Sequence, residues 1–109
     1  MRCIKTELYF GVDEPGGKQV GPKAWRDFLG QEVTPRFPRG MTVVEAYGQM
    51  QHRSGNTERQ ATRIIVLVHK PTPAAGRQIS EIIGLYRSRF ENAQVMRLRM
   101  PVLADFFTD

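Results

Sequence analysis

The sequence predicts one α+β domain in which a four-stranded antiparallel sheet carries two helices on one face. Three observations lead to this prediction. Four segments have the alternating or continuous apolar pattern of strands, and two have apolar residues at helical spacing after a proline start. The chain has 109 residues, 40% of them hydrophobic and 25% charged, which is ordinary for a globular domain. A chain of this length builds one core, so residues 1–109 are expected to form a single domain.

The first part of the chain predicts a strand and a helix. Residues 4–12 alternate between apolar and polar side chains, which is typical of a half-buried strand. A turn cluster at 13–17 follows it. Pro22 then favours a helix start, and Pro35 ends the helix because the residue before a proline avoids helical geometry. We expect a helix over 22–33 with a buried side formed by Trp25, Phe28, Leu29 and Val33.

The middle of the chain predicts a pair of strands joined by a hairpin. Residues 41–50 contain the β-branched and aromatic residues that strands favour. Ser54-Gly55-Asn56 is a hairpin-turn signal, and a strand over 61–69 follows it. The apolar run 64–68 marks this strand as a central one.

The last part predicts a second helix and a final strand. Thr72-Pro73 is a cap followed by a proline, and apolar residues then recur at i, i+3, i+4, i+7 and i+11 as far as Phe90. Residues 94–103 alternate as a strand, and Phe106 and Phe107 are expected to cover an edge of the core. The order strand, helix, strand, strand, helix, strand with right-handed crossovers predicts the ferredoxin-like plait, with strand order 4-1-3-2.

Composition argues against several kinds of site. Cys3 is the single cysteine of the sequence and cannot form a bridge within the chain. The other soft metal ligands of the sequence are His52 and His69. A closed zinc site needs four ligands, so we expect none within one chain. The sequence has no phosphate-binding loop, dinucleotide fingerprint, paired-cysteine motif or serine elbow. We therefore expect neither a metal nor a cofactor.

The sequence also predicts no membrane association. No apolar run is long enough to cross a bilayer, and strand-like sequence follows residues 1–5 without a signal-type apolar segment. The chain as given is expected in the cytoplasm. It is expected in the periplasm or outside the cell only if a leader has been removed.

Several motifs of the sequence are familiar in combination. The sequence reads TELYFG over residues 6–11, VTPRFP over 33–38, YGQ over 47–49 and YRSRF over 86–90. Together they resemble a family of small bacterial proteins catalogued as a domain of unknown function, over about residues 5–102. The resemblance implies one compact α+β domain and no particular activity. Many relatives look like exported proteins with a signal sequence, from which this chain differs.

Two helices on one face of the expected sheet leave the other face open, and function is sought there. The side chains expected to point toward the helices are those of Leu8 and Phe10, Val44 and Ala46, Val66 and Val68, and Met96 and Leu98. The opposite parity then places on the open face Lys5, Glu7 and Tyr9, Glu45, Tyr47 and Gln49, Arg63, Ile65, Leu67 and His69, and Arg97 and Arg99. A shift of one residue in a strand's register would reverse its contribution.

These residues supply the candidates for chemistry. His69 and Glu7 are candidate bases, and Tyr9 and Tyr47 are candidate hydrogen-bonding acids. Such groups, with cationic anchors, bind a small anionic or enolisable molecule and move protons in it. The candidate ligand-binding residues are Arg63, Arg97, Arg99 and Gln49, with Arg36 and Phe37 at a pocket mouth, unless Phe37 simply plugs the end of the sheet. The alternative is that these charges and tyrosines form cross-strand pairs on a solvated face.

Three functions stay open at this point. The favoured one is a homodimer through the open face that binds a small-molecule ligand, and the residues leave open whether it is also a cofactor-independent acid–base enzyme. A single-stranded nucleic-acid-binding module fits the pI of 9.9 and the tyrosines among arginines. Glu7 and Glu45 interrupt that basic surface, so nucleic acid is the less expected partner. The third is a protein-docking module that uses Ile65 and Leu67.

Overall fold

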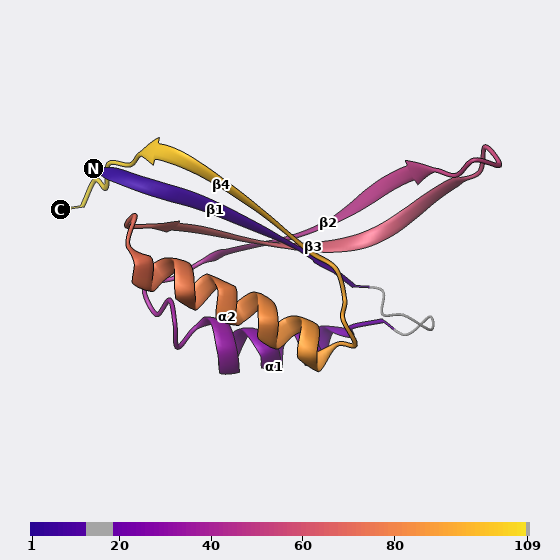
Figure 1. Ribbon diagram of the computed structural model, residues 1–109, viewed down its shortest axis with the longest axis horizontal. Helices are drawn as coiled ribbons and strands as arrows, with labels where there is room; N and C mark the ends of the chain where they lie inside the picture. The colour runs from indigo at the N-terminus through magenta and orange to yellow at the C-terminus, as the bar shows by residue number, and fades with distance from the viewer. Residues whose placement is uncertain (13–18, 109) are drawn as a thin grey trace.

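The computed structural model describes residues 1–12 and 19–108 and contains the elements that the sequence predicts (Figure 1). The expected turn at 13–17 lies outside the described residues. The strands are β1 (Arg2–Gly11), β2 (Thr42–Gln51), β3 (Thr57–His69) and β4 (Val95–Leu103). The helices are α1 (Pro22–Phe28), which continues into the π-helical turn η1 (Leu29–Val33), and α2 (Pro73–Arg89).

The strands form an antiparallel sheet in the order β2-β3-β1-β4, and both helices lie on the same side of it (Figure 1). β1 and β3 are central, because β1 pairs with β3 and β4 while β3 pairs with β1 and β2. This confirms the predicted ferredoxin-like plait and its strand order. We call the side of the sheet away from the helices the open face.

An aromatic cluster ties β1 to both helices. The Phe10 ring lies 5.3 Å from the ring of Trp25, 6.2 Å from that of Phe28 and 4.6 Å from that of Tyr86, measured between centroids. Phe90 packs on Tyr86 at 4.7 Å. All five residues are buried, and tilted or edge-to-face ring pairs add to the free energy gained by burial. The cluster therefore fixes which side of β1 faces the helices.

Local signals explain where the helices begin and how α1 ends. The Thr72 hydroxyl accepts a hydrogen bond from the Ala75 N–H at 3.2 Å, so it caps α2 at the predicted start. In η1 the Thr34 N–H donates to the Leu29 carbonyl at 2.9 Å, one residue further back than in an α-helix. This wider turn buries Val33 and leads into the loop that carries Arg36.

The β2–β3 hairpin extends beyond the rest of the sheet. β1 pairs with β3 only from Thr62 onward, so residues 47–61 pair with one another alone. We call residues 47–61 the arm. Its tip is the predicted turn, in which Gly55 has a φ of +90° that glycine adopts without strain. Figure 1 shows that the arm bends away from the side of the sheet that the helices cover.

The structure corrects the predicted face of β3. Residues that lie opposite each other in an antiparallel pair point to the same face, and Ile65 lies opposite Leu8 while Arg63 lies opposite Phe10. The prediction for this strand is therefore wrong: Arg63, Ile65, Leu67 and His69 lie on the helix side, and Val66 and Val68 lie on the open face.

Local sequence does not reveal the face of this strand, because the apolar run 64–68 has no alternation. Arg63 is buried, with its guanidinium 5.4 Å from the Trp25 ring centroid and donating to the Val20 carbonyl at 2.7 Å. A long stem and several donors let an arginine be buried in this way when each polar end finds a partner.

The predicted faces of β2 and β4 are reversed as well. Glu45 lies opposite Arg63, so Glu45, Tyr47 and Gln49 are on the helix side and Val44 and Ala46 on the open face. Arg97 lies opposite Leu8 and Arg99 opposite Thr6, so both arginines are on the helix side and Met96 and Leu98 on the open face. Both strands are at edges of the sheet, where their helix-side residues remain exposed to water. Polar residues are therefore tolerated on the side that was expected to be apolar.

Phe106 and Phe107 do not cover the core. Their exposed fractions are 68% and 94%, because the chain leaves the sheet after β4. That prediction is wrong, whereas the predicted open-face positions of Lys5, Glu7 and Tyr9 on β1 are correct.

Replacing Tyr86 by phenylalanine should destabilise the fold. The Tyr86 hydroxyl donates to the Gly11 carbonyl at 2.6 Å, and its loss leaves that carbonyl without this partner. We expect the free energy of unfolding to fall by about 1–2 kcal/mol, measured by urea denaturation. Tyr47→Phe is the control, because the Tyr47 side chain is exposed and its unfolding midpoint should stay unchanged. An unchanged midpoint in Tyr86→Phe would contradict this role of the hydroxyl.

Candidate functional site

A groove runs between α2 and the edge strand β4 on the helix side of the sheet. It consists of two hollows of about 490 and 350 Å³ that share Gly76 and Arg99, and we call it the α2–β4 groove. The larger hollow is lined by Pro73, Gly76, Arg77, Ser80, Glu81, Arg97 and Arg99. The smaller one adds Ile4, His69, Pro71, Thr72, Met100 and Pro101.

Small residues on α2 leave room for this groove. Gly76, Ser80 and Gly84 recur every four residues and so share one side of the helix. A Cβ atom added to Gly76 would meet no other atom within 4 Å, which shows open space at this position. Glycine inside a helix costs about 1 kcal/mol relative to alanine. The helix therefore loses stability where the groove is open.

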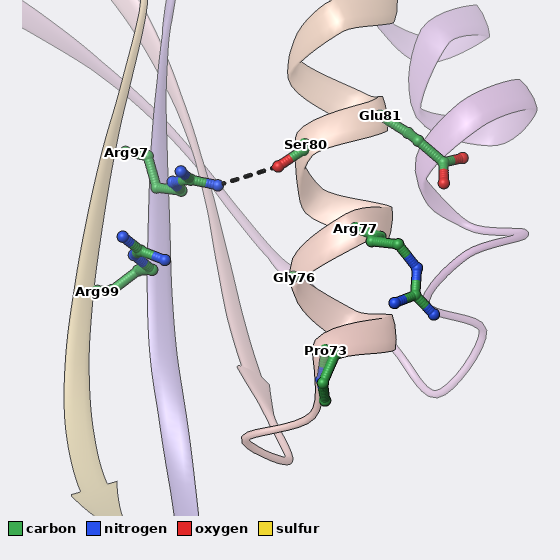
Figure 2. A pocket seen from close by; sticks show the side chains of 7 residues that line it. All are labelled: Pro73, Gly76, Arg77, Ser80, Glu81, Arg97 and Arg99. Atoms are coloured by element: carbon green, nitrogen blue, oxygen red, sulfur yellow. Dashed lines mark hydrogen bonds between the residues drawn. The ribbon is translucent and has the colours of Figure 1, made fainter.

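Two arginines project from β4 toward α2 across the groove (Figure 2). Nη1 of Arg97 donates to the Ser80 hydroxyl at a long distance of 3.4 Å. Arg99 has no hydrogen bond or ion pair with any residue that the structure describes. Both side chains are exposed, so their remaining N–H donors are available to a ligand.

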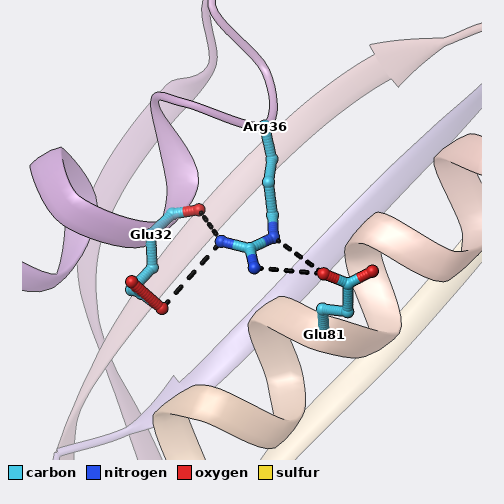
Figure 3. A network of polar contacts seen from close by, with 3 residues as sticks. All are labelled: Glu32, Arg36 and Glu81. Carbon is cyan, nitrogen blue, oxygen red and sulfur yellow. Dashed lines mark hydrogen bonds and ion pairs between the residues drawn. The ribbon is translucent and has the colours of Figure 1, made fainter.

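Glu81, the acidic residue that lines the groove, is paired with an arginine that does not line it. Figure 3 shows Arg36, in the loop after η1, between Glu32 and Glu81. Its Nη2 and Nε lie 3.0 and 3.3 Å from Oε2 of Glu81, and its Nη1 donates to the Glu32 carbonyl at 2.9 Å. Arg36 thus joins the loop to α2 and is not free to anchor a ligand. With Glu81 paired in this way, the groove retains the positive charge of Arg97 and Arg99.

His69 lies at the end of the groove with both ring nitrogens engaged. Nδ1 is 2.9 Å from the Lys70 carbonyl oxygen, and Nε2 is 2.8 Å from the Thr6 hydroxyl. A carbonyl only accepts, so this geometry assigns the proton of the neutral ring to Nδ1, and Nε2 then accepts from Thr6. Neither nitrogen is free to take a proton from a ligand. Phe37 packs against the core with its ring 6.2 Å from that of His69, in agreement with its alternative role as a plug.

Glu7 and Tyr9 form a pair on the open face, away from the groove. The Tyr9 hydroxyl donates to Oε2 of Glu7 at 2.7 Å, and Nζ of Lys5 lies 3.4 Å from Oε1. The hydrogen bond from Tyr9 lowers the pKa of Glu7, with a smaller contribution from Lys5 and against the opposing effect of burial. The same bond raises the pKa of Tyr9. Glu7 is thus held as a carboxylate and Tyr9 as a neutral phenol.

The structure does not bring the other candidates into the groove. Tyr47 and Gln49 lie on the arm, where Arg59 stands 5.5 Å from the Tyr47 ring centroid and donates to Oε1 of Gln49 at 3.0 Å. Arg63 belongs to the core. Among the predicted site residues, Arg97, Arg99 and His69 therefore share one place. Sequence reasoning missed Gly76, Arg77 and Ser80. The four-residue spacing of small residues was the available signal for Gly76 and Ser80, and no signal marked Arg77.

Among residues 1–12 and 19–108, no three His, Cys, Asp or Glu side chains come close enough to hold a metal ion. No helix in this described part of the chain has the length and apolar character needed to cross a membrane.

Replacing Tyr9 by phenylalanine should raise the pKa of Glu7 toward or above its ordinary value of 4.5, because the largest cause of the lowering is removed. A lowered pKa in the folded state stabilises the fold above the unfolded pKa, and this stabilisation is lost as the pH falls. The variant should therefore be less stable than the parent at pH 7, and the difference should shrink in acid. An NMR titration of the Glu7 carboxyl measures the pKa, with Tyr47→Phe as the control. Identical titration in all three proteins would contradict the assigned bond.

The fold is similar to that of solved structures, and a family model matches the sequence. No curated protein matches the sequence. Among solved structures, a phage SAM lyase in complex with S-methyl-5′-thioadenosine matches with a TM-score of 0.64 and 11% identity, over 97% of this chain and 93% of that one. A phage SAM lyase in the apo state matches with a TM-score of 0.58 and 8% identity, over 98% and 94%. At these identities the likeness concerns the fold alone. The family model described as "Protein of unknown function (DUF3574)" matches residues 5–106, and this chain therefore belongs to that family.

Proposed function

We propose that this protein binds a small anionic ligand in the α2–β4 groove and that it does so as a homodimer. One observation carries the ligand: the guanidinium groups of Arg97 and Arg99 face an open groove, and neither has an acidic partner among the described residues. A guanidinium offers a planar fork of donors that fits carboxylate and phosphate oxygens. These are the anionic groups that the groove is suited to hold.

The smaller hollow indicates the rest of the ligand. Ile4, Pro71 and Pro101 contribute apolar surface next to Arg99. Each hollow, at about 490 and 350 Å³, has a volume within the usual range for small-molecule sites, about 300–1,000 Å³. We therefore propose a ligand with an anionic group at Arg97 and Arg99 and an apolar body that lies against the proline-lined end.

The geometry favours binding over acid–base catalysis. The candidate base His69 uses both ring nitrogens, and Glu7 and Tyr9 satisfy each other on the opposite side of the sheet. Tyr47 lies on the arm. General acid–base catalysis needs such groups within hydrogen-bond reach of one ligand. The acid–base candidates of this chain do not meet that condition within one copy.

The solved structures suggest a second ligand class to test. A protein of similar fold, the phage SAM lyase, has been solved with S-methyl-5′-thioadenosine. This molecule is an uncharged nucleoside thioether and would not use the arginines as an anion does. It therefore separates a nucleoside site from an anion site in the same binding experiment.

The structure gives little support to single-stranded nucleic acid as the ligand. That hypothesis needed arginines beside exposed aromatic rings on one face. Arg63 is buried, Arg97 and Arg99 lie on the helix side, and the Tyr9 hydroxyl is bonded to Glu7. The open face thus lacks the predicted combination of stacking rings and phosphate-binding cations.

Replacing Arg99 by glutamine should weaken anion binding at least tenfold, because a charge-assisted contact is lost. Thermal shift and calorimetry with phosphate, citrate and an aromatic carboxylate measure the effect, with S-methyl-5′-thioadenosine in parallel. Arg87→Gln is the matched control: it removes the same charge from the exposed end of α2, outside the groove. Equal losses in both variants would show unspecific charge attraction. A parent protein that binds none of the anions would refute the proposed ligand.

Replacing Gly76 by leucine should block the groove without disturbing the fold. The new side chain enters open space, and leucine favours a helix more than glycine does. We expect a melting temperature equal to or above that of the parent and a loss of anion binding of at least tenfold. Gly84→Leu is the control, because it makes the same change in α2 at a position that also has space but does not line the groove. Unchanged binding in Gly76→Leu would place the ligand elsewhere.

A further inference from the structure

The open face presents an apolar surface on both sides of β1. It is formed by Met96, Leu98 and Met100 of β4, by Val66 and Val68 of β3, and by Val44 of β2. Leu98 is 41% exposed and Val68 is 47% exposed, so these are not core side chains. Single exposed apolar residues are common, but apolar rows on three strands of one face mark an interaction surface.

The polar residues between these apolar rows need no further partner. Lys5 and Glu7 form an ion pair, and the Tyr9 hydroxyl donates a hydrogen bond to the Glu7 carboxylate. In the described four-stranded part of the sheet, Lys5 and Glu7 are the charged side chains of the open face, and their charges cancel. A surface of this kind can be covered by apolar groups without leaving an unpaired charge. Its one lysine among the described residues, Lys5, is already paired with Glu7, which disfavours an anionic partner such as RNA.

The arm adds to this surface and has little support from its own domain. All the residues of β2 are exposed, and within the arm β2 and β3 pair with each other alone. A two-stranded ribbon is only marginally stable in water. The radius of gyration is 15.5 Å, whereas a compact chain of this length has about 13 Å. The arm bends toward the open-face side, so the backbone of the sheet and the arm curves toward this side (Figure 1).

We infer that a second copy of this chain covers the open face and is held by the arm. The inference rests on the homodimer of the proposed function and is independent of its ligand. The chain carries a formal charge of +5, which opposes association of two copies through most surfaces. The charges of Lys5 and Glu7 on the open face cancel, apolar rows flank them, and Arg97 and Arg99 lie on the other side of the sheet. It is therefore the surface through which two copies can meet without charge repulsion.

The size of the surface fits a stable dimer. Strands about 4.8 Å apart and residues about 3.3 Å apart give a face of roughly 500 Å², to which the arm adds roughly 150 Å². Two copies then bury about 1,300 Å² in total, which is within the range of specific interfaces. A two-fold axis lets each copy present the same apolar rows to the other.

The mass of the full chain in solution tests this inference. Light scattering after gel filtration, at micromolar concentration, should give twice the chain mass of 12.5 kDa or a larger multiple. Leu98→Lys should raise the dissociation constant at least tenfold, and its ammonium group lies opposite Glu7, which keeps the single copy folded. Val43→Lys is the control, because Val43 is equally exposed at 39% but lies on the helix side. Circular dichroism melting verifies that each variant is folded.

A substitution in the arm tests the part of the arm in this interface. Met50 lies on the open-face side of the arm, opposite Glu58, so Met50→Lys should also weaken association at least tenfold. Association that persists in Leu98→Lys and Met50→Lys would overturn this interface while leaving a homodimer, and a monomeric parent would overturn both. Arg99→Gln should remain associated. A monomer that binds anions through Arg99 would show that the interface is wrong and the ligand site is right. A dimer that binds no anion would show the reverse.

Discussion

The packing of Leu8 and Phe10 against the helices sets the orientation of every strand in the sheet. Both side chains are fully buried, and Phe10 contacts aromatic rings of α1 and α2. Because β1 is central, the residues opposite these two on β3 and β4 must point to the same side. This places Ile65 and Arg63 in the core and Arg97 beside α2. The groove and the apolar open face both follow from that one constraint.

Residues of β4 contribute both to the α2–β4 groove and to the open face. Arg97 and Arg99 flank α2, where the small side chains of Gly76 and Ser80 leave them exposed to water and to a ligand. Met96, Leu98 and Met100 alternate with these arginines in sequence, point to the other face of the sheet and are apolar. Neither helix covers that side, so the apolar residues have no partner within the described part of the chain. Arg97 and Arg99 lie on the helix side of the sheet and Leu98 on the open face, so substitutions at these positions alter the proposed ligand site and the proposed interface separately.

Much of the fold could be predicted, but little of the site. The ends of the elements carry strong local signals, such as Pro22, Thr72 and the turn at Gly55, and the structure places elements there. The site depends on the face of each strand, which the local pattern leaves undecided. Arg63 is buried because its guanidinium contacts the Val20 carbonyl and the Trp25 ring, which lie far away in the chain. The predicted sides of His69 and Arg97 are wrong for the same reason, and the sequence does not show that Thr6 and Lys70 engage the ring of His69.

The sequence by itself determined the elements, their order and the plait, because capping, proline geometry, alternation and the handedness of crossovers act over short stretches of chain. It also determined that β4 has one apolar and one cationic side. Only the tertiary structure decided which of those sides faces the helices. Alternation with a period of two indicates that the two faces of a strand differ in polarity. It does not indicate which of the two faces the helices cover. That choice is made by contacts between distant residues, here the burial of Phe10 among Trp25, Phe28 and Tyr86.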